Sequence, residues 1–142
     1  MTVSAFAPLC LDPPCALVCV NRHTATAVDI LERGVLGINV LGEHQLELSR
    51  RCAAPGEAKF LDDDDLLPDI EGGSYLAPVL RTSVISLDCR ADVLDAPVSH
   101  LAVLAHVVAV VPRADRPPLL YGDGQYHRAL PLHPSASQGA SR

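Results

Sequence analysis

The strongest constraint on the fold is a pair of strand patterns in the second half of the chain. Between Ile85 and Val93, apolar and polar residues alternate strictly, which is typical of a strand with one face in the core and one in water. The run LAVLAHVVAVV at 101–111 is apolar throughout and predicts a strand buried on both faces, with His106 as a core histidine. The alternation assigns the solvent-facing side of the first strand to Ser86, Asp88, Arg90 and Asp92.

The rest of the chain predicts more strands than helices. TVSAFA (2–7), CALVCV (15–20) and LGINVL (36–41) predict further strands, and PPLLYGDGQYHRAL (117–130) predicts a closing hairpin. The segments 24–34 and 43–52 predict short helices, the first with Thr24 as N-cap and with Val28 and Leu31 on one face. At least five strands and two helices favour a mainly β fold, a small barrel with helical caps, because a parallel sheet needs more crossover helices.

Composition narrows the function. The 142 residues predict one domain over 1–130, followed by a disordered polar tail over 131–142. A net charge of −6 argues against nucleic-acid binding, and the longest apolar run is too short to cross a membrane. The five cysteines form no CxxC pair or other zinc-binding spacing, so no metal site is expected. We expect a soluble cytoplasmic protein with reduced core cysteines.

The order of the segments resembles one known family. MTVSAF, LDPP, ALVCV, NRHTATA, INVL and CAAPGEAKF follow one another as in the flavin reductase family, and the likeness continues to about residue 130. These are short NAD(P)H:flavin oxidoreductases with an FMN-binding split barrel. The resemblance implies an enzyme that binds FMN or FAD, takes hydride from NADH or NADPH, and supplies reduced flavin to a partner monooxygenase.

The resemblance also bears on the start of the chain and on its assembly. Family members carry some thirty residues before the methionine that matches Met1, including a first barrel strand. Either the start at Met1 is late, or this is a shortened member that lacks that strand. A barrel without its first strand exposes an edge, and an exposed edge must be paired or covered. Another subunit covers it most simply, which favours the homodimer that is usual in the family.

Matching the family's motifs residue by residue gives candidates for the flavin phosphate. Thr24 and Thr26 match its hydroxyl donors, and the helix that they open would aim backbone N–H groups at the anion. A plain N-cap without a ligand is the other interpretation of Thr24. Lys59 and Phe60 match the family's Asp-Lys-Phe, with Ala58 in place of the acidic residue.

Further candidates follow for the flavin ring and the nicotinamide. Asn39 fits either a ring-facing strand or a satisfied amide at a strand end. His100 matches the histidine of the family's Gly-Asp-His, but Val98 and Ser99 replace the first two residues, so no acidic neighbour orients the imidazole. Tyr126 fits a lid over the flavin or a packing aromatic. The resemblance implies ring contacts for Thr2, Ser4, Ala5, Asn39, Val40 and Leu41, and a catalytic role for His100.

The differences from the family's motifs leave two other classes of function open. A split-barrel homologue without reductase activity could use the pocket for a non-redox reaction such as a cyclisation, because shaping a substrate's conformation needs no cofactor. A flavin carrier without turnover is the second. A reductase predicts bound flavin with NAD(P)H consumption, a cyclase predicts a colourless protein, and a carrier predicts colour without turnover.

Overall fold

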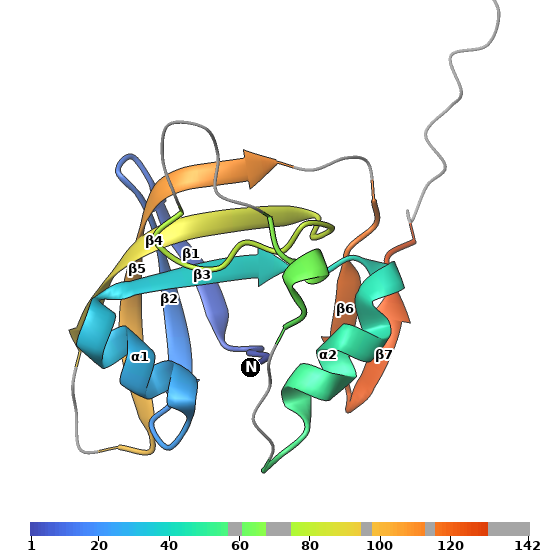
Figure 1. Cartoon of the computed structure of the whole chain (residues 1–142), viewed down its shortest axis with the longest axis horizontal. Helices are drawn as coiled ribbons and strands as arrows, with labels where there is room; N and C mark the ends of the chain where they lie inside the picture. Colours follow the sequence, from blue (N-terminus) through green and yellow to red (C-terminus); the bar gives the residue numbers. More distant parts are fainter. Residues whose placement is uncertain (57–60, 68–74, 95–97, 113–115, 131–142) are drawn as a thin grey trace, which may run out of the picture.

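The chain is mainly β, as predicted. The computed structural model describes residues 1–56, 61–67, 75–94, 98–112 and 116–130. Two helices, a five-stranded sheet and a separate hairpin are arranged as an open barrel beside a helix–hairpin unit (Figure 1). The elements are β1 (Phe6–Leu11), β2 (Pro14–Asn21), α1 (Ala25–Arg33), β3 (Val35–Val40), η1 (Glu43–Gln45), α2 (Leu46–Ala53), η2 (Asp63–Asp65), β4 (Ile85–Leu94), β5 (His100–Pro112), β6 (Leu119–Gly122) and β7 (Gln125–Arg128).

The main sheet has the strand order β1-β2-β5-β4-β3, and every neighbouring pair is antiparallel. The strands β1 and β3 are therefore its edges within the described residues. The hairpin β6–β7 stands apart and joins the barrel through an isolated bridge between Gly42 and Pro118. The helix α2 packs beside this hairpin (Figure 1). None of the described helices is long and apolar enough to span a membrane.

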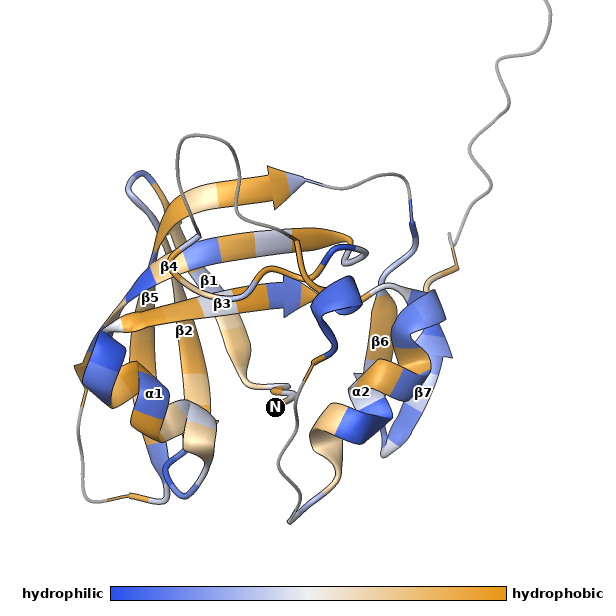
Figure 2. Ribbon diagram, in the orientation of Figure 1, coloured by the Kyte–Doolittle hydropathy of each residue, from blue (hydrophilic) through white to orange (hydrophobic). Residues whose placement is uncertain are grey.

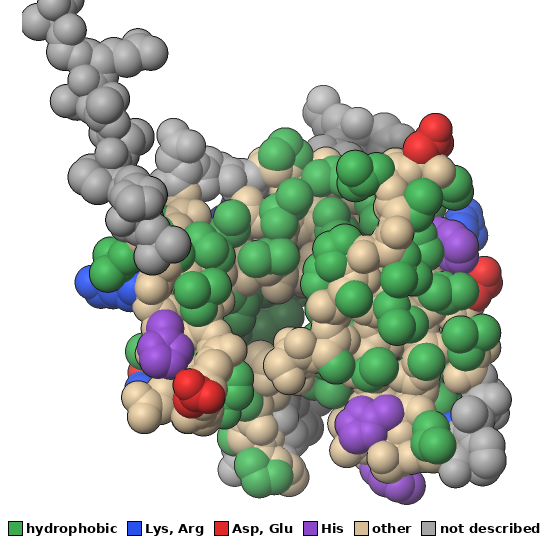
Figure 3. Space-filling view, turned by 180° about the vertical axis from the view of Figure 1, so that it is seen from behind, with side chains coloured by type: hydrophobic (Ala, Val, Ile, Leu, Met, Phe, Trp, Pro, Cys, Tyr) green, Lys and Arg blue, Asp and Glu red, His purple; other side chains and the backbone are tan. Residues whose placement is uncertain are grey.

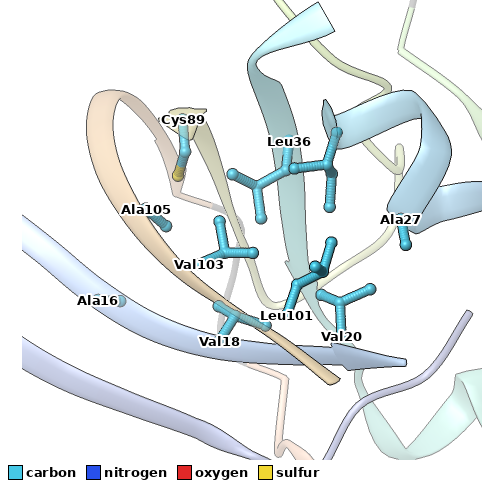
Figure 4. Packing of buried hydrophobic residues seen from close by; sticks show 10 residues of the cluster. Ala16, Val18, Val20, Ala27, Leu36, Cys89, Leu101, Val103 and Ala105 are labelled. Atoms are coloured by element: carbon cyan, nitrogen blue, oxygen red, sulfur yellow. The ribbon is translucent and has the colours of Figure 1, made fainter. Parts of the chain in front are cut away.

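The core lies between the sheet and α1. Alternate residues of β2 and β5 point inward, and Leu36 of β3 and Cys89 of β4 complete this layer (Figure 4). From α1, Ala27 and Ile30 enter the core, whereas Val28 and Leu31 on its other side are about half exposed. Hydrophobic and hydrophilic residues are mixed along α1 (Figure 2). The inward residues of the two central strands are Ala16, Val18, Val20, Leu101, Val103 and Ala105.

The first strand lies four residues further along the chain than predicted. Residues 2–5 are outside β1, which begins at Phe6 and continues through Pro8 to Leu11. The reason is the shortness of the turn: Leu11 faces Pro14, so only Asp12 and Pro13 connect the strands. The prediction placed Pro13 and Pro14 in a loop. Pro8 is tolerated within the strand because β1 is an edge strand, whose outer side needs no hydrogen-bond donor.

The two strand patterns that favoured a β fold hold only in part. β5 alternates between buried and partly exposed residues up to Ala105, and beyond it Val108 and Val110 are 50% and 51% exposed, so the strand is not buried on both faces. On β4, both Ser86 and Asp88 are buried rather than solvent-facing. The segment before β4 covers them: the Leu76 and Ala77 amides donate to the Asp88 carboxylate, and the Ser83 hydroxyl lies 2.7 Å from that of Ser86. Alternation alone does not reveal such a cover.

Two predictions about core residues were wrong. His106 is partly exposed rather than a core residue, and its Nε2 lies 2.9 Å from an oxygen of the Asp92 carboxylate on β4. Among the cysteines only Cys89 is buried, because Cys10 lies on the exposed edge strand and the other three are partly exposed. All five thiols are free.

Candidate functional site

The loop before α1 forms the first part of the site. The Thr24 hydroxyl accepts a hydrogen bond from the Ala27 amide at 3.2 Å and donates to the Asn21 carbonyl at 2.8 Å, so it acts as the N-cap. In the described part of the chain, no hydrogen bond occupies the amides of Ala25 and Thr26. Free amides at the start of a helix suit an anion such as a phosphate. The Thr26 hydroxyl belongs to the same turn, whereas the Thr24 hydroxyl is already occupied.

The turn that carries His100 is attached to this loop. His100 faces Asn21 in the β2–β5 ladder, and the Arg22 amide donates to the Ser99 carbonyl at 3.1 Å. The Arg22 side chain reaches the same turn, with Nε 3.2 Å from the Val98 carbonyl oxygen. The Ser99 hydroxyl lies 2.9 Å from Nδ1 of His100. A neighbour that orients the exposed imidazole therefore exists, although the sequence suggested none after the loss of the acidic residue.

The first residues of the chain lie between the barrel and the helix–hairpin unit (Figure 1). The sulfur of Met1 is 3.7 Å from the Thr24 hydroxyl, which places it beside the start of α1. Thr2 is partly exposed, Ser4 and Ala5 are exposed, and the Ala5 carbonyl accepts from the Cys19 amide at 3.0 Å. From behind, a hollow floored by hydrophobic side chains opens between the two parts of the molecule (Figure 3).

The Asn39 side chain faces the segment that precedes β4. Its Oδ1 accepts from the Leu80 amide at 3.0 Å and from the Ser86 hydroxyl at 2.6 Å, and its Nδ2 donates to the Pro78 carbonyl at 3.3 Å. The Ser83 hydroxyl in turn lies 2.7 Å from that of Ser86. Both the oxygen and the nitrogen of the side-chain amide thus have partners within the fold. The side chain of Asn39 therefore matches the second interpretation, a satisfied amide at a strand end.

The end of β3 joins the barrel to the hairpin. The Val40 carbonyl accepts from the Val84 amide at 2.8 Å, and the Leu41 carbonyl accepts from the Leu119 amide at 2.8 Å. Both side chains are partly buried. A ligand in the hollow would therefore find these residues held rigidly, but their carbonyl groups already occupied.

Tyr126 packs within the helix–hairpin unit. Its hydroxyl lies 3.1 Å from that of Ser49 on α2, and its ring meets the ring of Tyr121 edge to face at 5.0 Å between centroids. The Arg50 guanidinium lies 5.9 Å from the centroid of the Tyr126 ring. These contacts match the packing interpretation of Tyr126, which attaches α2 to the hairpin that borders the hollow.

The structure thus brings Thr24, Thr26 and His100 together with the first residues of the chain, and it separates them from Tyr126. Lys59 and Phe60, together with the tail over 131–142, lie outside the described residues. Sequence reasoning missed Arg22, which ties the His100 turn to the loop before α1. The motif NRHTATA contains it, but an arginine that bonds to a distant backbone carbonyl leaves no pattern in the sequence.

Comparison with known proteins identifies the family of the chain. Residues 1–130 match the family described as flavin reductase like domain. A flavin reductase (NADH) of Kitasatospora aureofaciens is 37% identical over 131 residues, which are 90% of this chain and 66% of that protein, so the chain spans just under two thirds of its length. An NADH:FMN oxidoreductase of Rhodococcus erythropolis is 31% identical, over 92% of this chain and 68% of that protein.

Solved structures show the same fold. The flavin reductase domain protein from Arthrobacter superposes with a TM-score of 0.78 at 26% identity, covering 94% of this chain and 80% of that chain. The NADH:FAD oxidoreductase SgcE6 of Streptomyces globisporus gives a TM-score of 0.76 at 25% identity, over 92% and 78%. The predicted fold class is confirmed, and the chain belongs to the flavin reductase-like domain family.

Proposed function

We propose that this protein is an NADH-dependent flavin reductase that supplies reduced FMN or FAD to a separate monooxygenase. The observation that carries the proposal is the match of residues 1–130 to the flavin reductase-like domain, on a fold shared with reductases of known structure. The donor follows relatives named for NADH, and both flavins occur in the names. The partner follows a relative named as the reductase component of a 4-nitrophenol monooxygenase in Rhodococcus opacus.

The residues present fit a flavin. The hollow offers an apolar surface for a planar ring, and the free amides of Ala25 and Thr26 offer donors to a phosphate (Figure 3). A bound flavin would supply the hydride acceptor, and the protein's part is to position it. The start of α1 would anchor the phosphate, and Ser99 would hold the His100 imidazole at the rim of the same corner. Internal hydrogen bonds hold Thr24 at this corner.

We also propose that the chain works as a homodimer in the cytoplasm. The second half of β5 reads VVAVV, yet Val108 and Val110 are half exposed in one copy. Apolar side chains in such a run gain free energy when a second surface covers them, and an identical chain offers one. The cytoplasm fits five free thiols and the supply of NADH.

The first experiment separates a reductase from the two alternatives. The purified chain is titrated with FMN by fluorescence quenching, and NADH absorbance is then followed at fixed flavin. We expect saturable binding and flavin-dependent NADH oxidation. Binding without oxidation would identify a carrier, and absence of binding would favour a non-redox enzyme; either result contradicts the proposal.

A second titration tests the phosphate anchor. Thr26→Ala removes a hydroxyl at the start of α1, and a hydrogen bond to a charged group is worth about 1.5–3 kcal/mol, so the Kd for FMN should rise roughly tenfold or more. Riboflavin lacks the phosphate, so its Kd should not change. Thr24→Ser, which keeps the capping hydroxyl, is the matched control and should bind FMN normally. An equal loss for FMN and riboflavin would place the phosphate elsewhere.

A further inference from the structure

The tight hairpin between β1 and β2 sets two thiols directly opposite each other. Cys10 and Cys15 are Cα partners in the antiparallel register, one pair before the closing pair of the turn. Partners in such a ladder have Cα atoms about 4.5–5.5 Å apart, within the range of about 4.4–6.8 Å that a disulfide requires. Both thiols are free, Cys10 is exposed, and its Sγ donates to the Asp12 carbonyl at 3.1 Å.

The same register extends this pair into a row across four strands. Cys15 on β2 faces His106 on β5, and His106 faces Arg90 on β4. The Asp92 carboxylate lies 2.9 Å from Nε2 of His106. An ionised carboxylate only accepts hydrogen bonds, so with Nε2 as the donor to Asp92, Nδ1 is the ring nitrogen that can take up a proton. Cys15 therefore has a proton acceptor on the neighbouring strand, and Cys10 is exposed, which are two conditions that favour thiol oxidation.

We propose that Cys10 and Cys15 form a redox-active dithiol that hydrogen peroxide oxidises to a cross-strand disulfide. The exposed Cys10 thiolate attacks one peroxide oxygen, the O–O bond breaks, and hydroxide departs. Cys10 is then a sulfenic acid. Cys15, its proton taken up by His106, attacks that sulfur; the S–S bond forms and the S–O bond breaks. In balance, two thiols lose two electrons and two protons, and one peroxide becomes two waters.

This disulfide would fix the part of the hairpin that backbone pairing holds least. Pro14, in the pair that closes the turn, lacks an amide hydrogen, and the β1–β2 register shifts between Pro8 and Cys10. A covalent link between Cys10 and Cys15, next to that closing pair, would restrain the edge strand. The inference does not rest on flavin reduction, although reduced flavin that meets dioxygen would be a source of peroxide.

The position of Asp12 between the two cysteines allows a direct test. The full chain, dilute enough to disfavour contacts between copies, is treated with hydrogen peroxide, alkylated with N-ethylmaleimide in denaturant, and cleaved on the N-terminal side of aspartate. Cleavage gives residues 1–11, which hold Cys10, and 12–28, which hold Cys15 and Cys19. We expect the two fragments to remain joined, two hydrogens lighter than their sum, until a reductant separates them.

Two variants identify the partner of Cys10. Cys19→Ser should leave the joined fragments unchanged, and Cys15→Ser should abolish them; circular dichroism confirms that each variant folds. The proposal is overturned if the joined fragments persist in Cys15→Ser. It is also overturned if they arise only from intact protein that has the mass of a covalent dimer before cleavage. It is equally overturned if wild-type Cys10 is oxidised to sulfinic acid while Cys15 remains alkylated.

Discussion

At the scale of single residues, buried polar side chains hold the segment before β4 against the sheet. The Asp88 carboxylate accepts from the Leu76 amide at 2.9 Å and from the Ala77 amide at 3.2 Å, and Asp88 is only 3% exposed. A buried amide that loses its acceptor costs about 1–3 kcal/mol. These bonds therefore stabilise the wall of the barrel that β3 and β4 build.

We predict that Asp88→Ala lowers the free energy of unfolding by about 2–5 kcal/mol, because two buried amides lose their acceptor. Asp88→Asn keeps one carbonyl acceptor and should lose roughly half as much. Urea denaturation followed by circular dichroism measures both. Asp92→Ala, which removes an exposed carboxylate from the same strand, should cost no more than about 0.5–1 kcal/mol. Equal losses for the variants at 88 and 92 would contradict the role of burial.

The buried thiol of Cys89 makes the stability of the protein fall at alkaline pH. Burial, with the nearby Asp88 and Cys15, raises the pKa of its thiol from 9.0 to about 12. Below pH 9.0 the Cys89 thiol keeps its proton in both the folded and the unfolded chain. Between pH 9.0 and about 12 only the unfolded chain loses that proton. The thiol's contribution to stability is therefore complete below pH 9 and is lost as the pH rises toward 12, by at most about 1.4 kcal/mol per pH unit.

The test compares wild type with Cys89→Ala in urea, at neutral pH and at about pH 10. The other titrating groups are common to both chains and cancel. The difference in unfolding free energy, wild type minus variant, should become smaller at the higher pH. A constant difference would mean that the thiol ionises equally in both states.

Some of these residue roles follow from the sequence and some do not. Thr24 as an N-cap is a local pattern, and the helix begins where it predicts. Strict alternation predicts that Ser86 and Asp88 face solvent, but the segment before β4 covers that face of the strand, and no local pattern reveals this cover. The partners of Asn39 lie 39 to 47 residues away, a distance at which no local pattern can identify them.

At the scale of elements, β3 depends on close contact with the segment that crosses it. A Cβ at Gly37 would lie 2.7 Å from the Pro78 carbonyl oxygen, closer than side-chain carbons approach backbone. The same segment supplies the carbonyl that Asn39 contacts two residues further along β3. Glycine is thus required at this position by space rather than by backbone conformation.

We predict that Gly37→Ala costs roughly 1–3 kcal/mol of stability, because Pro78 and its neighbours must move away from β3. Gly122→Ala is the matched control: it lies in β6, and a Cβ there meets nothing within 4 Å. Both substitutions add the same methyl group and restrict the unfolded chain alike, so thermal unfolding of the pair isolates the clash. Equal melting temperatures for the two variants would contradict the predicted contact.

The elements themselves were largely predictable. Strands predicted at 15–20, 36–41 and 85–93, and helices at 24–34 and 43–52, occur within one to three residues of the observed bounds. Those strands carry residues whose β-branched side chains suit a sheet and whose ends coincide with turn formers. β1 was misplaced because its turn contains only two residues and its own Pro8 resembles a break.

At the scale of the whole molecule, one copy leaves an apolar strand segment in water. The interior of the barrel accounts for β5 up to Ala105, and beyond it nothing among the described residues covers Val108 and Val110. The continuous apolar run at 101–111 predicts a strand buried on both faces. The prediction failed for a single chain, and the proposed homodimer is the arrangement in which it would hold.

We predict that Val108→Glu separates the dimer into monomers without unfolding them. A stable interface buries about 1,200–2,000 Å² in total, and a carboxylate buried without a partner costs several kcal/mol, enough to outweigh the affinity of a modest interface. Val28→Glu on α1 is the matched control, since Val28 is 49% exposed against 50% for Val108 and lies on another element. Light scattering after size-exclusion chromatography should give twice the chain mass for wild type and for Val28→Glu, and the chain mass for Val108→Glu. A monomeric wild type, or a dimeric Val108→Glu, would show that β5 is covered in some other way, and the exposed valines would then need a different partner.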